Sequence, residues 1–193
     1  MKYYSGIGSR NIPQDIKNIM YKLGSKLAKE GYILRSGGAK GADTAFEKGV
    51  SAAKAKGDME IYLPYNGYQN RKKDNENYFV PIEFSNYKKA VLIADKFHLT
   101  FQRLSSEEKN FIVRDIYQVL GRDLKTSSDF VICWTPDGAV NDKQRSEKTG
   151  GTGQAISTAS YYSIPVLNLK KEKHLHKISS YLKGESSLFV NKF

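Results

Sequence analysis

The chain has 193 residues, and its 31 lysine and arginine residues against 20 aspartate and glutamate residues give a formal charge of +11 at pH 7. Apolar residues make up 39% and charged residues 26%, proportions that argue against a disordered tail or a membrane protein. A basic surface attracts phosphates and polyanions, so the charge favours an anionic partner. No apolar run approaches the ~18 residues that span a bilayer, and the N-terminus lacks the apolar core of a signal peptide. We therefore expect a cytoplasmic protein with no membrane partner.

Residues 1–64 alternate between the patterns of strands and helices. A strand is predicted over 2–8 and a helix over 11–31, where apolar residues recur at helical spacing. A second strand over 31–36 and a second helix over 41–55 follow, and the third strand covers 59–64.

The remaining residues resume this alternation after an interruption. Residues 65–104 are largely polar, and we interpret them as an irregular insertion that holds at most a short helix. Ser105 and Glu108 have the spacing of a capping box, which predicts a helix that ends at Gly121. The further predicted elements are a strand over 128–134, a turn and helix over 149–163, a strand over 164–169 and a closing helix over 174–182, within a C-terminal helix and tail over 170–193.

Alternating strands and helices predict a parallel sheet with right-handed connections. The strand over 128–134 is almost wholly apolar, as a strand buried on both faces should be. The sequence therefore predicts one domain over 1–193, an α/β fold with a single doubly wound, Rossmann-like parallel sheet. We expect about five or more strands with helices on both faces.

Three glycine-bearing turns lead from strands toward helices: "GIGSRN" at 6–11, "SGGAKGAD" at 36–43 and "TGGTGQA" at 149–155. The carboxyl ends of parallel strands meet at one edge of a sheet, so we expect the three turns to lie together. Glycine lets backbone amides approach a ligand closely, and the helix ends add partial positive charge. The turns therefore predict a phosphate-binding edge. The candidate ligand-binding residues are Gly8, Ser9, Arg10, Arg35, Ser36, Gly37, Gly38, Ala39, Lys40, Asp43, Trp134, Gly150, Gly151, Thr152 and Gly153.

Some of these residues also have a purely structural interpretation. Asp43 heads a helix, where a carboxylate either caps backbone amides or holds a ribose, and capping is favoured. Trp134 either stacks on a base or packs beneath the following loop. Arg114 and Gln118 lie one helical turn apart and would share a face, which we interpret as exposed to solvent.

Several classes of site are not supported by the residues. A dinucleotide enzyme needs an acidic residue after the second strand, where this chain has Arg35 and Ser36, and the second turn lacks the G-K-[ST] ending of a phosphate-binding P-loop. The three histidines show no metal-ligand spacing, and there is no G-x-S-x-G nucleophile elbow. We expect Cys133 to be a buried hydrophobe. We therefore expect no metal, no cofactor and no identified catalytic residue.

The segments "IGSR", "GYILRSGGAKGADTAFEKG" and "GGTGQAI" occur in this order, and with them the chain resembles the SLOG superfamily. That superfamily joins the folds of DNA-processing protein A and of the LOG enzymes, and the chain looks most like the small members that bacteriophages carry. The resemblance covers residues 3–63 and about 105–169. It implies a nucleotide, a nucleotide-derived signal or single-stranded DNA as the ligand.

The resemblance and the turns together lead to three hypotheses. The leading one is a protein that senses or sequesters a phosphate-bearing nucleotide without converting it, and we expect a dimer or higher homo-oligomer. The second is single-stranded DNA binding in the manner of DNA-processing protein A. The third is a LOG-like phosphoribohydrolase acting on nucleoside monophosphates. Its motif P-G-G-x-G-T-x-x-E is altered here at Thr149, Gln154 and Ser157, which leaves Glu47 and Glu147 as candidate acids by position alone.

Overall fold

A computed structural model describes residues 1–53 and 59–188. Its centre is a six-stranded parallel sheet with the strand order β4-β3-β2-β1-β5-β6. The strands are β1 (Lys2–Gly6), β2 (Tyr32–Ser36), β3 (Met59–Tyr62), β4 (Tyr78–Phe79), β5 (Phe130–Cys133) and β6 (Val166–Asn168). The predicted Rossmann-like fold class is confirmed.

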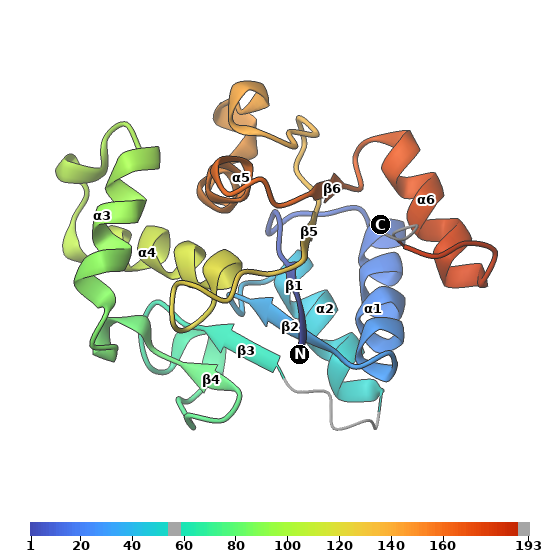
Figure 1. The fold of residues 1–193 in the computed structure, drawn as a ribbon, viewed down its shortest axis with the longest axis horizontal. Coiled ribbons are helices and arrows are strands. Elements are labelled where there is room, and N and C mark those ends of the chain that lie inside the picture. The colour runs from blue at the N-terminus through green and yellow to red at the C-terminus, as the bar shows by residue number, and fades with distance from the viewer. Residues whose placement is uncertain (54–58, 189–193) are drawn as a thin grey trace.

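Helices cover both faces of the sheet (Figure 1). One apolar core joins the sheet to α1 (Gln14–Lys29), α2 (Ala42–Ala52) and α6 (Glu172–Lys183). The other joins it to α3 (Tyr87–Phe97), α4 (Ser106–Leu120) and α5 (Thr152–Tyr161). The sheet is therefore doubly wound, as alternating buried strands and amphipathic helices require.

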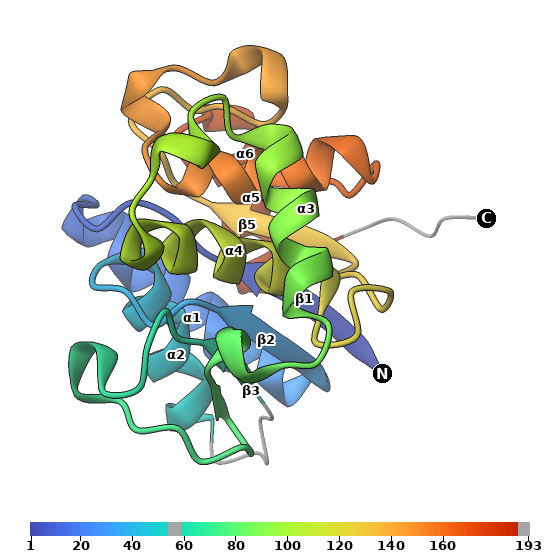
Figure 2. The same cartoon turned by 90° about the vertical axis from the view of Figure 1, so that its left-hand side faces the viewer.

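The residues at 65–104 are more regular than the sequence suggests. They add β4 at the edge of the sheet, three short 3-10 helices and α3, which packs beside α4 (Figure 2). The prediction of an irregular insertion is therefore only partly right. The strand signal was missed because β4 has two residues, too few for an alternating pattern to be visible.

Local signals elsewhere set the ends of the elements. Ser105 accepts a hydrogen bond from the backbone N–H of Glu108, and the Glu108 carboxylate accepts one from the N–H of Ser105, so the predicted capping box is present. Gly121 ends α4 with φ 76°, a conformation that favours glycine. The end of the helix predicted over 41–55 lies outside the described residues, as do the last five residues of the tail.

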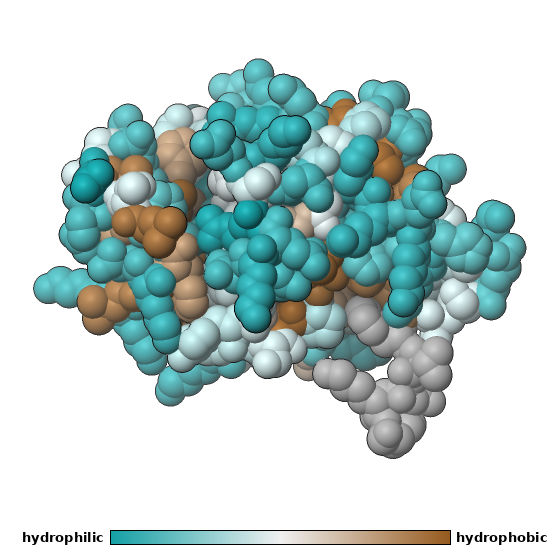
Figure 3. Space-filling model, turned by 90° about the horizontal axis from the view of Figure 1, so that it is seen from above, coloured by the Kyte–Doolittle hydropathy of each residue, from teal (hydrophilic) through white to brown (hydrophobic). Residues whose placement is uncertain are grey.

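Hydrophilic side chains cover most of the face seen from above (Figure 3). Hydrophobic side chains gather at the end of this face where α3 lies in Figure 1. The large hydrophobic residues that the structure leaves exposed include Leu92, Leu99, Tyr161 and Tyr162.

Candidate functional site

The strand order reverses at β1. The chain proceeds outward from β1 to β4 on one side and then crosses to β5 on the other side of β1. Connections that leave neighbouring strands in opposite directions open a crevice at the carboxyl edge of a parallel sheet. A cavity of about 490 Å³ lies at this switch point. Its lining comes from the turn after β1, from α2 and α4, and from the loop that enters α5: Ile7, Gly8, Ser9, Arg10, Asn11, Ala39, Asp43, Phe111, Ile112, Arg114, Asp115, Gln118, Pro136, Lys148, Thr149, Gly150, Gly151, Thr152 and Ala155.

The outer part of the cavity offers positive charge and backbone donors. Arg10 and Lys148 are exposed residues that line it from two sides. The backbone N–H groups of Gly151 and Thr152, at the start of α5, donate to no acceptor in the described part of the chain. Unpaired amides at a helix N-terminus and two nearby cations are suited to a phosphate group.

A half-buried carboxylate holds the loop that carries these donors. Asp137 accepts hydrogen bonds from the hydroxyls of Thr135 and Ser146, each at 2.7 Å, and from the hydroxyl of Thr149. Partial loss of water acts to raise the pKa of Asp137, but these donors stabilise the ionised form and hold the pKa well below its ordinary value. The network fixes the path between β5 and α5 and thereby the position of Lys148.

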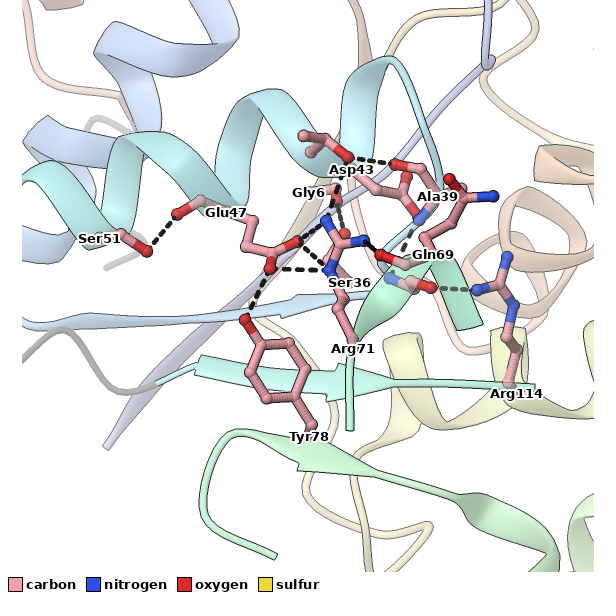
Figure 4. Close-up of polar contacts among 12 residues, drawn as sticks. Gly6, Ser36, Ala39, Asp43, Glu47, Ser51, Gln69, Arg71, Tyr78 and Arg114 are labelled. Atoms are coloured by element: carbon pink, nitrogen blue, oxygen red, sulfur yellow. Dashed lines mark hydrogen bonds and ion pairs between the residues drawn. The ribbon is translucent and has the colours of Figure 1, made fainter. Parts of the chain in front are cut away.

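Side chains hold the second glycine turn through hydrogen bonds to its backbone (Figure 4). The Asp43 carboxylate accepts hydrogen bonds from the backbone N–H groups of Gly37 and Ala39, each at 3.2 Å. The carbonyl of Gly37 accepts one from the guanidinium of Arg114. The favoured interpretation, that Asp43 caps the helix it heads, was wrong: α2 has no side-chain cap, and Asp43 binds amides of the preceding turn instead. This turn anchors α4, and two of its amides are taken by Asp43.

Charged and polar side chains of α4 form the inner end of the cavity. Arg114, Asp115 and Gln118 are 7%, 7% and 2% exposed. The Nε2 atom of Gln118 donates to Oδ1 of Asp115 at 3.0 Å, and Nε of Arg114 lies 3.7 Å from the same oxygen. The guanidinium of Arg114 also lies 5.4 Å from the ring centres of Tyr68 and Phe111.

Burial controls the ionisation of the two carboxyl groups in the cavity. Loss of water raises the pKa of Asp115 to about 7 and that of Asp43 to about 6. Arg114 opposes both shifts, and the proximity of Asp43 raises the pKa of Asp115 further. A carboxyl group that titrates near neutral pH inside a cavity is typical of functional sites.

Eight of the fifteen predicted site residues line this cavity: Gly8, Ser9, Arg10, Ala39, Asp43, Gly150, Gly151 and Thr152. Three others belong to the second turn behind it. The Ser36 hydroxyl donates to the carbonyl of Gly6 at 2.6 Å, Gly37 pairs with Asp43 and Arg114, and Gly38 has φ 67° and faces Arg71, Ile61 and Leu63.

The other four predicted residues lie away from the cavity. Arg35 is 2% exposed, donates to Glu60 at 2.6 Å and stacks 3.8 Å from the ring centre of Tyr3. Trp134 packs in the core, and only its carbonyl reaches the first turn, where it accepts from the N–H of Ser9. Lys40 lines a neighbouring cavity beside Arg10, and Gly153 is buried in α5.

Sequence reasoning placed Arg114 and Gln118 on a solvent-exposed face, and this was wrong because both are buried and line the cavity. Asp115 was missed altogether. The sequence held no local signal for this, because only the structure shows that every residue from Val113 to Leu120 is buried and that this stretch has no solvent-exposed side. Charged residues inside such a stretch must face a polar cavity or each other.

The two glutamates considered as catalytic acids do not line the cavity. Glu47 forms an ion pair with Arg71 at 2.6 Å and accepts a hydrogen bond from Tyr78 at 2.7 Å. Glu147 is exposed on the loop before α5. The geometry therefore offers no support for the hydrolase through these residues.

The described residues form neither a membrane-spanning helix nor a cluster of metal ligands. None of their helices is long and apolar enough to cross a membrane. No group of three or more histidine, cysteine, aspartate or glutamate residues among them is placed to hold a metal ion.

No protein family model matches the chain, and no curated protein matches it. The chain is similar to a solved structure of DNA processing protein A from Helicobacter pylori, whose description concerns a unique single-stranded DNA binding mode. The two share 17% sequence identity with a TM-score of 0.45, over 96% of this chain and 74% of the other. The function proposed for this chain rests on its cavity and not on this similarity.

Proposed function

We propose that the chain binds a phosphate-bearing nucleotide, or a signal derived from one, in the cavity at the switch point. The observation that carries this proposal is the separation of charge inside the cavity. Unpaired amides of Gly151 and Thr152 stand with Arg10 and Lys148 at the outer part, while Asp115 and Gln118 are buried at the inner end. A ligand that fits carries an anion at one end and neutral hydrogen-bond donors at the other, as a nucleotide does.

The proposal includes binding without conversion, as a sensor or sequestering protein. Calorimetry with AMP, GMP and ADP-ribose, followed by chromatography of the recovered ligand, tests both parts. We expect binding below millimolar concentration and an unaltered ligand. Lack of binding by all three compounds would contradict the site, and an altered ligand would identify an enzyme.

The phosphate end is tested by Arg10→Ala. Removal of one charge-assisted hydrogen bond is expected to weaken binding by about 1.5 to 3 kcal/mol. Lys22→Ala is a matched control, because Lys22 is an exposed cation on α1 that lines neither this cavity nor the neighbouring one beside Arg10. Equal affinities for the two variants would place the phosphate elsewhere.

A separate observation favours single-stranded DNA binding as a second candidate function. Phe97, Tyr161 and Tyr162 form a surface cluster. The ring centres of Phe97 and Tyr161 lie 5.2 Å apart, and those of Tyr161 and Tyr162 lie 5.1 Å apart. The ammonium of Lys96 lies 3.7 Å from the ring centre of Tyr161, which is 56% exposed. Exposed aromatic rings beside a cation are the elements that stack bases and neutralise phosphates.

A fluorescent oligothymidylate tests this second candidate. Affinity should fall steeply as salt rises, and Tyr161→Ala should weaken binding by about 1 to 3 kcal/mol for one lost stacking contact. Tyr21→Ala is the control, because Tyr21 is also exposed but stands on α1, outside the cluster. An oligonucleotide that stays unbound at low salt would exclude this function.

A further inference from the structure

The inner end of the cavity presents two neighbouring acceptor atoms. An ionised carboxylate only accepts hydrogen bonds, so the Gln118 amide must turn its nitrogen toward Oδ1 of Asp115, as the 3.0 Å contact shows. The two oxygens that remain as hydrogen-bond acceptors are Oε1 of Gln118 and Oδ2 of Asp115. Within the described residues, neither oxygen accepts a hydrogen bond, and both side chains line the cavity.

Of the other charged groups at this end, Asp43 is engaged by backbone amides, whereas Nε of Arg114 has no hydrogen-bond partner among the described residues. Asp43 accepts from two amides of the second turn, and Arg114 donates to Gly37 while its Nε lies near Oδ1 of Asp115. A phosphate placed here would approach two buried carboxylates, which repel it. The inner end is therefore suited to an uncharged group that donates hydrogen bonds.

We propose that Asp115 and Gln118 select the ligand by accepting hydrogen bonds from two adjacent donors on its uncharged end. The inference rests on the proposed nucleotide binding and adds which end enters the cavity first. Two parts of a nucleotide carry such a pair of donors: the 2′,3′-diol of ribose, and the N1–H and amino group of guanine. An adenine edge presents a donor beside an acceptor and does not match two acceptors.

Buried acceptors discriminate because a ligand that lacks a donor leaves one of them without a partner. The experiment compares GMP with 2′-deoxy-GMP, which lacks one hydroxyl, and with IMP, which lacks the amino group. Burial raises the pKa of Asp115 to about 7, so calorimetry at pH 8 keeps the carboxylate ionised. We expect GMP to bind about tenfold or more tightly than one of the two analogues.

Asp115→Asn is the decisive variant. It keeps the shape of the side chain and an acceptor for Gln118, but it replaces the second oxygen by an NH₂ donor that opposes the donors of the ligand. We expect the preference to fall below about twofold. Gln118→Met, which removes the other acceptor, is expected to lower the preference too. Asp15→Asn, an exposed position on α1, should leave it unchanged.

The outcomes separate this inference from the function on which it rests. A preference that Asp115→Asn and Gln118→Met remove while GMP still binds supports the inference. Equal binding of all three nucleotides to the wild-type chain, or a preference that survives both substitutions, overturns the inference and leaves nucleotide binding standing. If none of the three nucleotides binds, the proposed function fails and the inference fails with it.

Discussion

Asp115→Asn should stabilise the fold at alkaline pH, and the gain should shrink as the pH falls. Burial raises the pKa of Asp115 from 3.8 to about 7 in the folded chain. Between these values the folded chain holds a proton that the unfolded chain has released. The free energy of unfolding therefore falls as the pH rises through this window. Asparagine does not titrate, so the variant lacks this dependence.

The size of the effect follows from the width of the window. From pH 5 to the folded pKa of about 7 there are two pH units, each equivalent to about 1.4 kcal/mol. The stability of the variant relative to wild type should therefore increase by about 3 kcal/mol between pH 5 and pH 8. Asp43, whose pKa burial raises to about 6, titrates in both proteins, so most of its contribution cancels in the comparison.

Urea unfolding of both proteins at pH 5, 6, 7 and 8 measures this difference. Asp15→Asn, at an exposed position, serves as the control and should show no such trend. A difference between Asp115→Asn and wild type that stays constant from pH 5 to pH 8 would refute the reasoning, because Asp115 would then titrate alike in the folded and unfolded chains.

Three further predictions concern the capping box, the loop before α5 and the second turn. Ser105→Ala should lower the free energy of unfolding by about 1 kcal/mol in urea titrations, because one amide of α4 loses its acceptor; a loss of ligand affinity would contradict this purely structural role. Asp137→Asn should weaken nucleotide binding and speed tryptic cleavage after Lys148, because one of the three hydroxyl donors loses its acceptor; unchanged cleavage would argue against a positioning role. Gly41→Ala should destabilise the chain by more than about 1 kcal/mol in thermal unfolding, because Gly41 has φ 83° and a Cβ would lie 2.3 Å from the Arg10 carbonyl oxygen; a stable variant would show that the turn adapts.

Patterns between near neighbours in the chain determined much of this protein. Apolar spacing along α1 and α4, the apolar run of β5 and the Ser105 capping box are local signals, since each depends on residues within one or two turns. Strand and helix alternation in turn determined the parallel sheet, and with it the edge where the turns meet. The eight predicted residues that line the cavity come from these rules.

The tertiary structure decided which polar groups face the cavity. Arg114 reaches Gly37, 77 positions away, and Arg35 pairs with Glu60 on a neighbouring strand, so neither environment could be derived from the adjacent residues. The second turn resembles the other two in sequence, yet Asp43 accepts hydrogen bonds from two of its amides. Whether a buried amide, carboxylate or guanidinium remains open to a ligand depends on the partners that folding brings to it, because a buried polar group takes whichever partner is within reach.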